Sequence, residues 1–231
     1  MYLKEINFNN IIQILNIKNK EEKNNKNKII KINGNNNSGK SIFSIIISKL
    51  LLNKYKILLI DNDENNILSK ILLENKNMNN EIIKILNNFY IINFDYILKE
   101  KINIINYLEK IKKEFDYIIV DSNNKDKNYM KIIDKEIYLI EPNMFEMKKI
   151  KKEIIQNNKI KIILNKSNLY SIDKNVIEKT INKKIIGEIE YSKNINLLIN
   201  NNLELKYLNK KETNNIIKIV KEVIDENWIR K

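Results

Sequence analysis

Two glycines, a lysine and a serine form the stretch of this chain that most clearly indicates chemistry. The segment 34–41 reads GNNNSGKS and matches the spacing G-x-x-x-x-G-K-[ST] at every fixed position. Glycines at these places let backbone N–H groups turn inward around an anion. The lysine then supplies a positive charge for phosphate oxygens, and the serine hydroxyl is a ligand for Mg²⁺. The spacing therefore indicates a loop that binds the phosphates of a nucleotide.

The whole loop and the residue after it are predicted to contact the nucleotide. These residues are Gly34, Asn35, Asn36, Asn37, Ser38, Gly39, Lys40, Ser41 and Ile42. We expect Lys40 to reach the β and γ phosphates and to act in catalysis, and Ser41 to hold the metal. The chain has only three glycines, of which the third is Gly187, so a chance match to the motif is improbable.

Acidic side chains follow two further apolar runs. FDYIIVDSN places Asp121 at the end of a predicted strand, where a carboxylate can serve the metal. KILLIDNDENN ends in Asp61 and Asp63, which point the same way if the segment is extended, so that one can orient the metal's waters and the other the attacking water. The alternatives are an ordinary loop start at Asp121 and a solvated acidic turn at 61–63.

Short apolar runs alternate with longer segments that have helical spacing. The runs of strand length are 28–33, 56–60, 89–93, 116–120, 136–140, 161–164 and 185–189. Helices are predicted from 41 to 52, directly after the loop, and around Ile104, Tyr107, Leu108 and Ile111. This alternation predicts an α/β fold in three layers, with a mostly parallel sheet and helices on both faces.

The first 27 residues differ from the rest. They contain a short amphipathic pattern and then a charged run, so we expect a helix on a tether at 1–27 and a single P-loop domain at 28–231. The helix is predicted either to bind a protein partner or to fray or cap the sheet edge. The last segment, 214–231, is a second amphipathic pattern, either a reversible membrane anchor or a helix packed on the sheet. Its mixed charges favour packing.

Composition narrows the class of protein. The net charge of +13 allows nucleic acid or an anionic membrane as partners, but the Lys, Asn and Ile bias of the whole chain is the favoured explanation for it. There is no cysteine, so disulfides and thiolate metal sites are excluded. The most apolar run, 42–52, is far shorter than the roughly 20 residues that span a bilayer. With Glu5 in the first residues, no export signal is predicted, and we expect a cytoplasmic protein that is peripheral at most.

Taken in order, these motifs resemble the MinD/ParA branch of P-loop ATPases. The segments that carry the likeness are GNNNSGKS (34–41), LLIDND (58–63), DYIIVDS (116–122), YLIEPN (138–143), IILNK (162–166) and IIGEIEYSKNINLLINN (185–201). The resemblance implies ATP and Mg²⁺ as cofactors and an ATP-dependent homodimer. It also implies that Asp63 positions the hydrolytic water, that Asp61 and Asp121 join Ser41 around the magnesium, and that Asn165 contacts adenine.

One position departs from that family. Its members usually carry a second lysine, in K-G-G-x-G-K-[ST], that reaches the nucleotide of the partner subunit, and Asn35 occupies that position here. Lys31, on the preceding strand, is not expected to replace it. The family's G-x-I-P segment also has Glu190 in place of proline. The resemblance therefore implies nucleotide binding with slow hydrolysis.

The roles that this resemblance implies are those of a nucleotide-dependent switch in positioning or assembling flagella, pili, the division septum or DNA. Relatives that donate electrons or insert metals are excluded because they need cysteines. Two alternatives stay open: a degenerate scaffold that binds nucleotide without hydrolysis, and a small-molecule synthetase or kinase of the same topology.

Overall fold

The computed structural model describes residues 28–52, 54–62, 66–73, 82–93, 104–122, 130–169, 172–200 and 204–224. The predicted helix and tether at 1–27, the predicted water-positioning residue Asp63, and residues 225–231 lie outside the described residues. The division of the chain at residue 28 therefore stays a prediction.

One sheet of eight strands organises the described part of the chain. Its strands are β1 (Lys28–Gly34), β2 (Ile57–Asn62), β3 (Ile83–Leu86), β4 (Phe89–Asn93), β5 (Tyr117–Ser122), β6 (Lys135–Ile140), β7 (Ile160–Asn165) and β8 (Ile185–Ile189). They lie in the order β3-β4-β2-β5-β1-β6-β7-β8, and every pair is parallel except β3 with β4. The interior strands are mostly apolar on both faces, as is typical of buried parallel strands.

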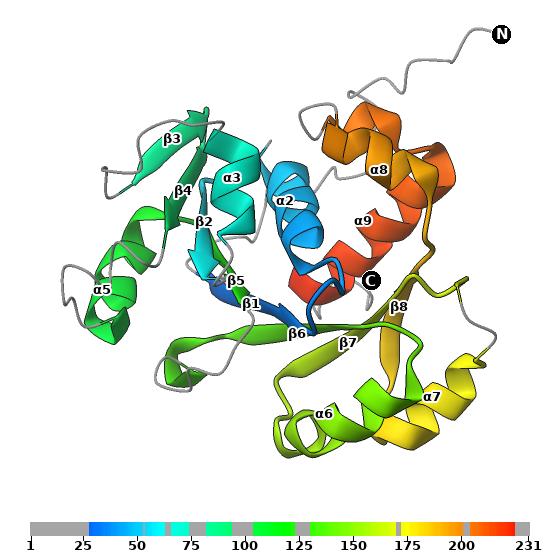
Figure 1. Cartoon of the computed structure of the whole chain (residues 1–231). Helices are drawn as coiled ribbons and strands as arrows, with labels where there is room; N and C mark the ends of the chain where they lie inside the picture. Colours follow the sequence, from blue (N-terminus) through cyan, green and yellow to red (C-terminus); the bar gives the residue numbers. More distant parts are fainter. Residues whose placement is uncertain are drawn as a thin grey trace, which may run out of the picture.

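Helices cover both faces of this sheet, which gives the three layers seen in Figure 1. The α-helices are α2 (Lys40–Leu51), α3 (Ile67–Leu73), α5 (Ile104–Ile111), α6 (Met144–Gln156), α7 (Lys174–Ile181), α8 (Lys193–Asn200) and α9 (Lys210–Ile224). Apolar side chains of α2, α3, α8 and α9 form one core with the sheet face that carries Ile30 and Ile32. The opposite face, which carries Ile29, holds two separate clusters, one under α5 and one under α6 and α7.

The expected α/β fold is confirmed, including its predominantly parallel sheet. All seven runs of strand length form strands, with ends shifted by at most two residues. One strand was not predicted: β3, a short strand at the sheet edge with partly exposed side chains. Its four residues, IKIL, are too few for periodicity to distinguish a strand from a helical turn.

The C-terminal segment is packed on the sheet through the end of its described part. Residues of α9 that face the core are Thr213, Ile216, Ile217, Ile219, Val220 and Val223. This confirms packing for residues up to 224. Among the helices that the structure describes, none has the length and apolar character needed to cross a membrane.

Close packing of α9 on β8 depends on Gly187. A Cβ atom built on Gly187 would lie 2.3 Å from Cγ1 of Ile219, so a side chain at this position would push the buried isoleucine away. We expect Gly187→Ala to lower the free energy of unfolding by about 1–3 kcal/mol, the usual cost of overpacking a core. Urea denaturation measures this loss.

A double-mutant cycle with Ile219→Ala provides the control. Because Ile219→Ala removes the clashing atoms, the effect of Gly187→Ala should largely vanish in that background. Equal effects in both backgrounds would contradict the packing explanation.

Candidate functional site

The glycine loop connects the end of β1 to the start of α2. Gly39, the N-cap residue of α2, has φ 88°, and Gly34 has φ 154°, a backbone region that side chains disfavour. A Cβ atom on Gly34 would also lie only 2.5 Å from the carbonyl oxygen of Leu139 on β6. Both motif glycines are therefore required by the loop conformation, which leaves backbone N–H groups at the helix N-terminus for an anion.

Lys40 begins α2, and its side chain folds back over the loop. It is 4% exposed, and its Nζ donates to the carbonyl oxygen of Asn35 at 3.1 Å. The loop closes on itself through the same carbonyl, which accepts from Ser38 N at 3.2 Å. The lysine is thus held at the mouth of the loop, where it can exchange a carbonyl partner for phosphate oxygens.

Ser41 and Asp121 meet at the carboxyl edge of the sheet. The Ser41 hydroxyl donates to Oδ2 of Asp121 at 2.6 Å, and both side chains are buried. Asp61 lies on the adjacent strand in direct register with Asp121. A hydroxyl and carboxylates beside a phosphate loop are the hard oxygen ligands that Mg²⁺ takes, so the residues present fit this metal.

Asp61 also has a structural task that the sequence analysis did not foresee. Its Oδ2 accepts from the backbone N–H of Ser69 in the first turn of α3, at 2.7 Å. Because one carboxylate oxygen serves the helix N-terminus, the other is the part of Asp61 that a metal's waters would use. Its place in the magnesium shell stays a prediction.

Asn165, at the end of β7, braces the loop. Its Nδ2 donates to the carbonyl oxygen of Ser38 at 2.7 Å, directly behind Gly39. The second N–H of this nitrogen and Oδ1 are the groups that could contact adenine, and that contact stays a prediction.

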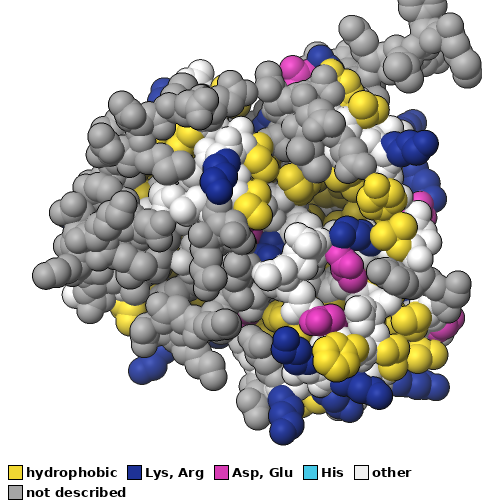
Figure 2. All heavy atoms as spheres, in the orientation of Figure 1, with side chains coloured by type: hydrophobic (Ala, Val, Ile, Leu, Met, Phe, Trp, Pro, Cys, Tyr) yellow, Lys and Arg dark blue, Asp and Glu magenta, His cyan; other side chains and the backbone are white. Residues whose placement is uncertain are grey.

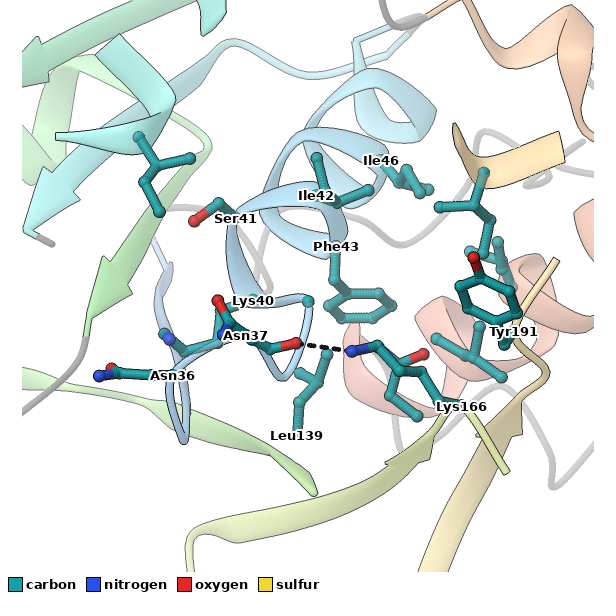
Figure 3. A pocket seen from close by; sticks show the side chains of 16 residues that line it. Asn36, Asn37, Lys40, Ser41, Ile42, Phe43, Ile46, Leu139, Lys166 and Tyr191 are labelled. Carbon is teal, nitrogen blue, oxygen red and sulfur yellow. Dashed lines mark hydrogen bonds between the residues drawn. The ribbon is translucent and has the colours of Figure 1, made fainter. Parts of the chain in front are cut away.

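Lys166 and Glu141 belong to the site, although the sequence analysis assigned neither a role. The Lys166 ammonium contacts Oε1 of Glu141 at 2.6 Å and the carbonyl oxygen of Asn37 at 2.9 Å, the bond drawn in Figure 3. Three segments distant in the chain are joined in this way: the loop, the end of β6 and the end of β7. The signal was present, since Glu141 and Lys166 stand in the EPN and NK segments.

An apolar pocket of about 420 Å³ continues from the loop. Its apolar walls include Ile42, Phe43, Ile189, Tyr191 and Ile195. Figure 2 shows hydrophobic side chains around a hollow on this face of the molecule, with basic and acidic side chains beside them. In Figure 3, Tyr191 lies across the pocket from Asn36 and Asn37, with Phe43 between them. The cavity thus has a phosphate-binding end and an apolar end, which is the polarity of a nucleotide.

The wall that carries Tyr191 is held by Asn168. Asn168 accepts from Tyr191 N at 2.7 Å and donates to Tyr191 O at 3.1 Å, so one side chain binds both backbone groups of the tyrosine. Ser167 N adds a bond to Ile189 O at 3.1 Å. The loops after β7 and β8 are joined by these bonds, and the tyrosine ring is placed where a flat base can pack against it.

Asn35, at the position of the family's second lysine, contacts α6. Its Nδ2 donates to Oε2 of Glu146 at 2.6 Å. Lys31 cannot take over the missing role, as expected, because it is buried in β1 against Glu136. No cation of the described loop other than Lys40 thus faces the phosphate end.

Comparison with protein families agrees with this geometry. The family model for the CobQ/CobB/MinD/ParA nucleotide-binding domain matches residues 29–205. The chain belongs to this family. As a MinD/ParA-family P-loop ATPase, it has the nucleotide-binding fold that the motifs indicated. Among curated proteins, no sequence matches the chain significantly.

Solved structures show the same fold at low sequence identity. The MinD cell division protein of Aquifex aeolicus is 19% identical, with a TM-score of 0.67 over 85% of this chain and 96% of that one. A ParA family ATPase from Chlorobium tepidum is 16% identical, with a TM-score of 0.65 over 87% and 99% of the two chains. The ATP complex of a Cyanothece McdA variant is 14% identical, with a TM-score of 0.62 over 85% and 95%.

Proposed function

We propose that the protein binds Mg-ATP and hydrolyses it slowly, as a nucleotide-dependent switch in the spatial positioning or assembly of a larger structure. The observation that carries this proposal is one continuous site. Lys40 and the Ser41–Asp121 pair lie at its phosphate end, and the apolar wall with Tyr191 lies at its base end. The resemblance to MinD, a cell division protein, supports the positioning role.

Each group of residues in this site has a separate role in binding Mg-ATP. The backbone N–H groups around Gly39 and the N-terminus of α2 hold phosphate oxygens, and Lys40 adds a charge once it leaves the Asn35 carbonyl. Ser41 and Asp121 would hold the magnesium, which neutralises charge on the β and γ phosphates when bound. We assign the orientation of the hydrolytic water to Asp63, following the family resemblance.

Slow hydrolysis follows from the substituted loop position. Asn35 cannot supply a cation, and it contacts Glu146, whose carboxylate adds negative charge near the phosphate end. The same observation favours the second candidate, a scaffold that binds ATP without hydrolysing it. We also propose a protein partner that binds through the N-terminal segment, and a cytoplasmic location that is peripheral at the membrane. DNA and a membrane surface are less favoured as partners.

Calorimetric titration and turnover assays test the proposal. The full chain should bind Mg-ATP at one site per protein, and turnover should be slow and should rise with anionic vesicles, DNA or a partner. Binding with no turnover under any condition would leave only the scaffold. Turnover that requires a small-molecule acceptor would indicate a synthetase or kinase, and absence of ATP binding would refute the proposal.

The metal side of the site is tested with Asp121→Asn. The amide keeps the shape but not the charge that pairs with Ser41 and the metal, so we expect Mg²⁺ to bind about 10–100-fold more weakly beside ATP. The measurement is ATP affinity as a function of Mg²⁺ concentration.

Asp173→Asn is the matched control for Asp121→Asn. Asp173 caps α7 by accepting from Asn175 N at 2.7 Å, and asparagine caps a helix equally well. The same magnesium dependence in wild type and Asp121→Asn would remove Asp121 from the metal site.

A further inference from the structure

Two charged side chains lie buried in the sheet behind the phosphate loop. Lys31 of β1 and Glu136 of β6 are cross-strand partners, with Lys31 Nζ 3.1 Å from Glu136 Oε1 and side-chain exposures of 2% and 1%. On the same face of the sheet lie two apolar clusters, one under α5 and another under α6 and α7. Burying two charges costs free energy that apolar residues here would not cost. The pair therefore needs an explanation beyond stability.

Glu136 reaches the loop through one residue. Asn33 Nδ2 donates to the same Oε1 of Glu136 at 3.0 Å, and Asn33 Oδ1 accepts from the backbone N–H of Gly34 at 2.8 Å. Asn33 and Lys31 are two positions apart on β1, so they lie on one face of the strand. The carboxylate is thus two hydrogen bonds away from the first residue of the loop.

The second carboxylate oxygen holds the far end of α6. Oε2 of Glu136 accepts from Asn157 Nδ2 at 3.1 Å, in the turn between α6 and β7. At its other end, α6 carries Glu146, which contacts Asn35. The loop is therefore tied to α6 at both ends of the helix, once through Glu136 and once through Glu146.

We propose that Glu136 is a positioning residue for the phosphate loop. With Lys31 balancing its charge, it holds the Asn33 amide in the one orientation in which Oδ1 faces Gly34 N, and it thereby sets the entry of the loop. A loop held in its binding conformation loses less conformational entropy when phosphates arrive. The inference rests on the proposed function, because it assumes that this loop binds a nucleotide.

The test replaces the ion pair by apolar side chains of similar size. Lys31→Met with Glu136→Met should still fold, since apolar pairs commonly replace buried ion pairs without loss. Its melting temperature should be somewhat below that of wild type, because the Asn33 and Asn157 amides lose their acceptor. We expect this variant to bind Mg-ATP at least tenfold more weakly. In the unliganded protein, the amides of 33–39 should exchange hydrogen faster, because Asn33 has lost its acceptor.

A conservative variant separates positioning from packing. Lys31→Met with Glu136→Gln is also uncharged but keeps a carbonyl oxygen for Asn33, and it should recover most of the affinity and the slow exchange. If the double methionine variant does not fold, Asn33→Ala takes its place, since it leaves the ion pair intact and should show the same tenfold loss.

The outcomes that overturn the inference differ from those that overturn the proposed function. Unchanged amide exchange over 33–39 in the double methionine variant, or in Asn33→Ala, would reduce Glu136 to a structural residue whatever the protein binds. Affinity within twofold of wild type would do the same. Faster amide exchange in the variant, together with a wild type that does not bind Mg-ATP, would support the positioning role of Glu136 and refute only the proposed binding of Mg-ATP.

Discussion

Replacing Lys40 with alanine is expected to weaken Mg-ATP binding by roughly a hundredfold or more. The ammonium is buried at the mouth of the loop, where it donates to the carbonyl oxygen of Asn35. With ATP it would form charged hydrogen bonds to two phosphates, each worth about 1.5–3 kcal/mol. Losing about 3 kcal/mol corresponds to a factor above one hundred in affinity. Isothermal titration of the full chain measures the change.

Lys148→Ala is the matched control for Lys40→Ala. Lys148 is an exposed lysine of α6, so its removal changes the net charge equally without touching the loop. Thermal unfolding should show that both variants fold. Unchanged ATP affinity in Lys40→Ala would mean that the loop does not bind phosphate, and the proposed function would fail with it.

Restoring a lysine at position 35 is expected to strengthen ATP-dependent association of two chains. Asn35 cannot supply a cation to the phosphates of an opposing subunit, so the wild type should associate weakly with a non-hydrolysable ATP analogue. Asn35→Lys combined with Asn36→Gly, which frees the loop backbone, should associate about tenfold more tightly or better, and hydrolysis should rise. Analytical ultracentrifugation with and without the analogue gives the association constant.

Glu146 provides a further arm of this experiment. Because Asn35 Nδ2 lies 2.6 Å from Glu146 Oε2, a new lysine at 35 would pair with this carboxylate within its own chain. Adding Glu146→Gln should release the lysine and increase the gain, and Asn36→Gly alone controls for loop flexibility. A wild type that already dimerises tightly on the analogue, with no gain in the variants, would show that another residue closes the interface.

Local patterns were sufficient for the phosphate loop and for most of the sheet. The spacing of Gly34, Gly39, Lys40 and Ser41 and the apolar run before them predicted strand, loop and helix, and the structure has all three. The contact between Ser41 and Asp121 followed from a general property of parallel sheets, whose strands end at one edge. Such features are readable because the interactions that form them depend on neighbours in the chain or on a repeated topology.

Tertiary structure alone decided which atoms each polar side chain meets. Asn165 donates to the loop carbonyl of Ser38, Asp61 accepts from the first turn of α3, and Lys31 is buried against Glu136. Each partner is set by strand register and by helix placement, and in the first and third pairs more than a hundred residues separate the two members. A shift of one residue in register would turn Lys31 and Glu136 to opposite faces, and composition does not determine register. By itself, the sequence therefore determined the chemistry of the loop, and the packed sheet determined what holds that loop in place.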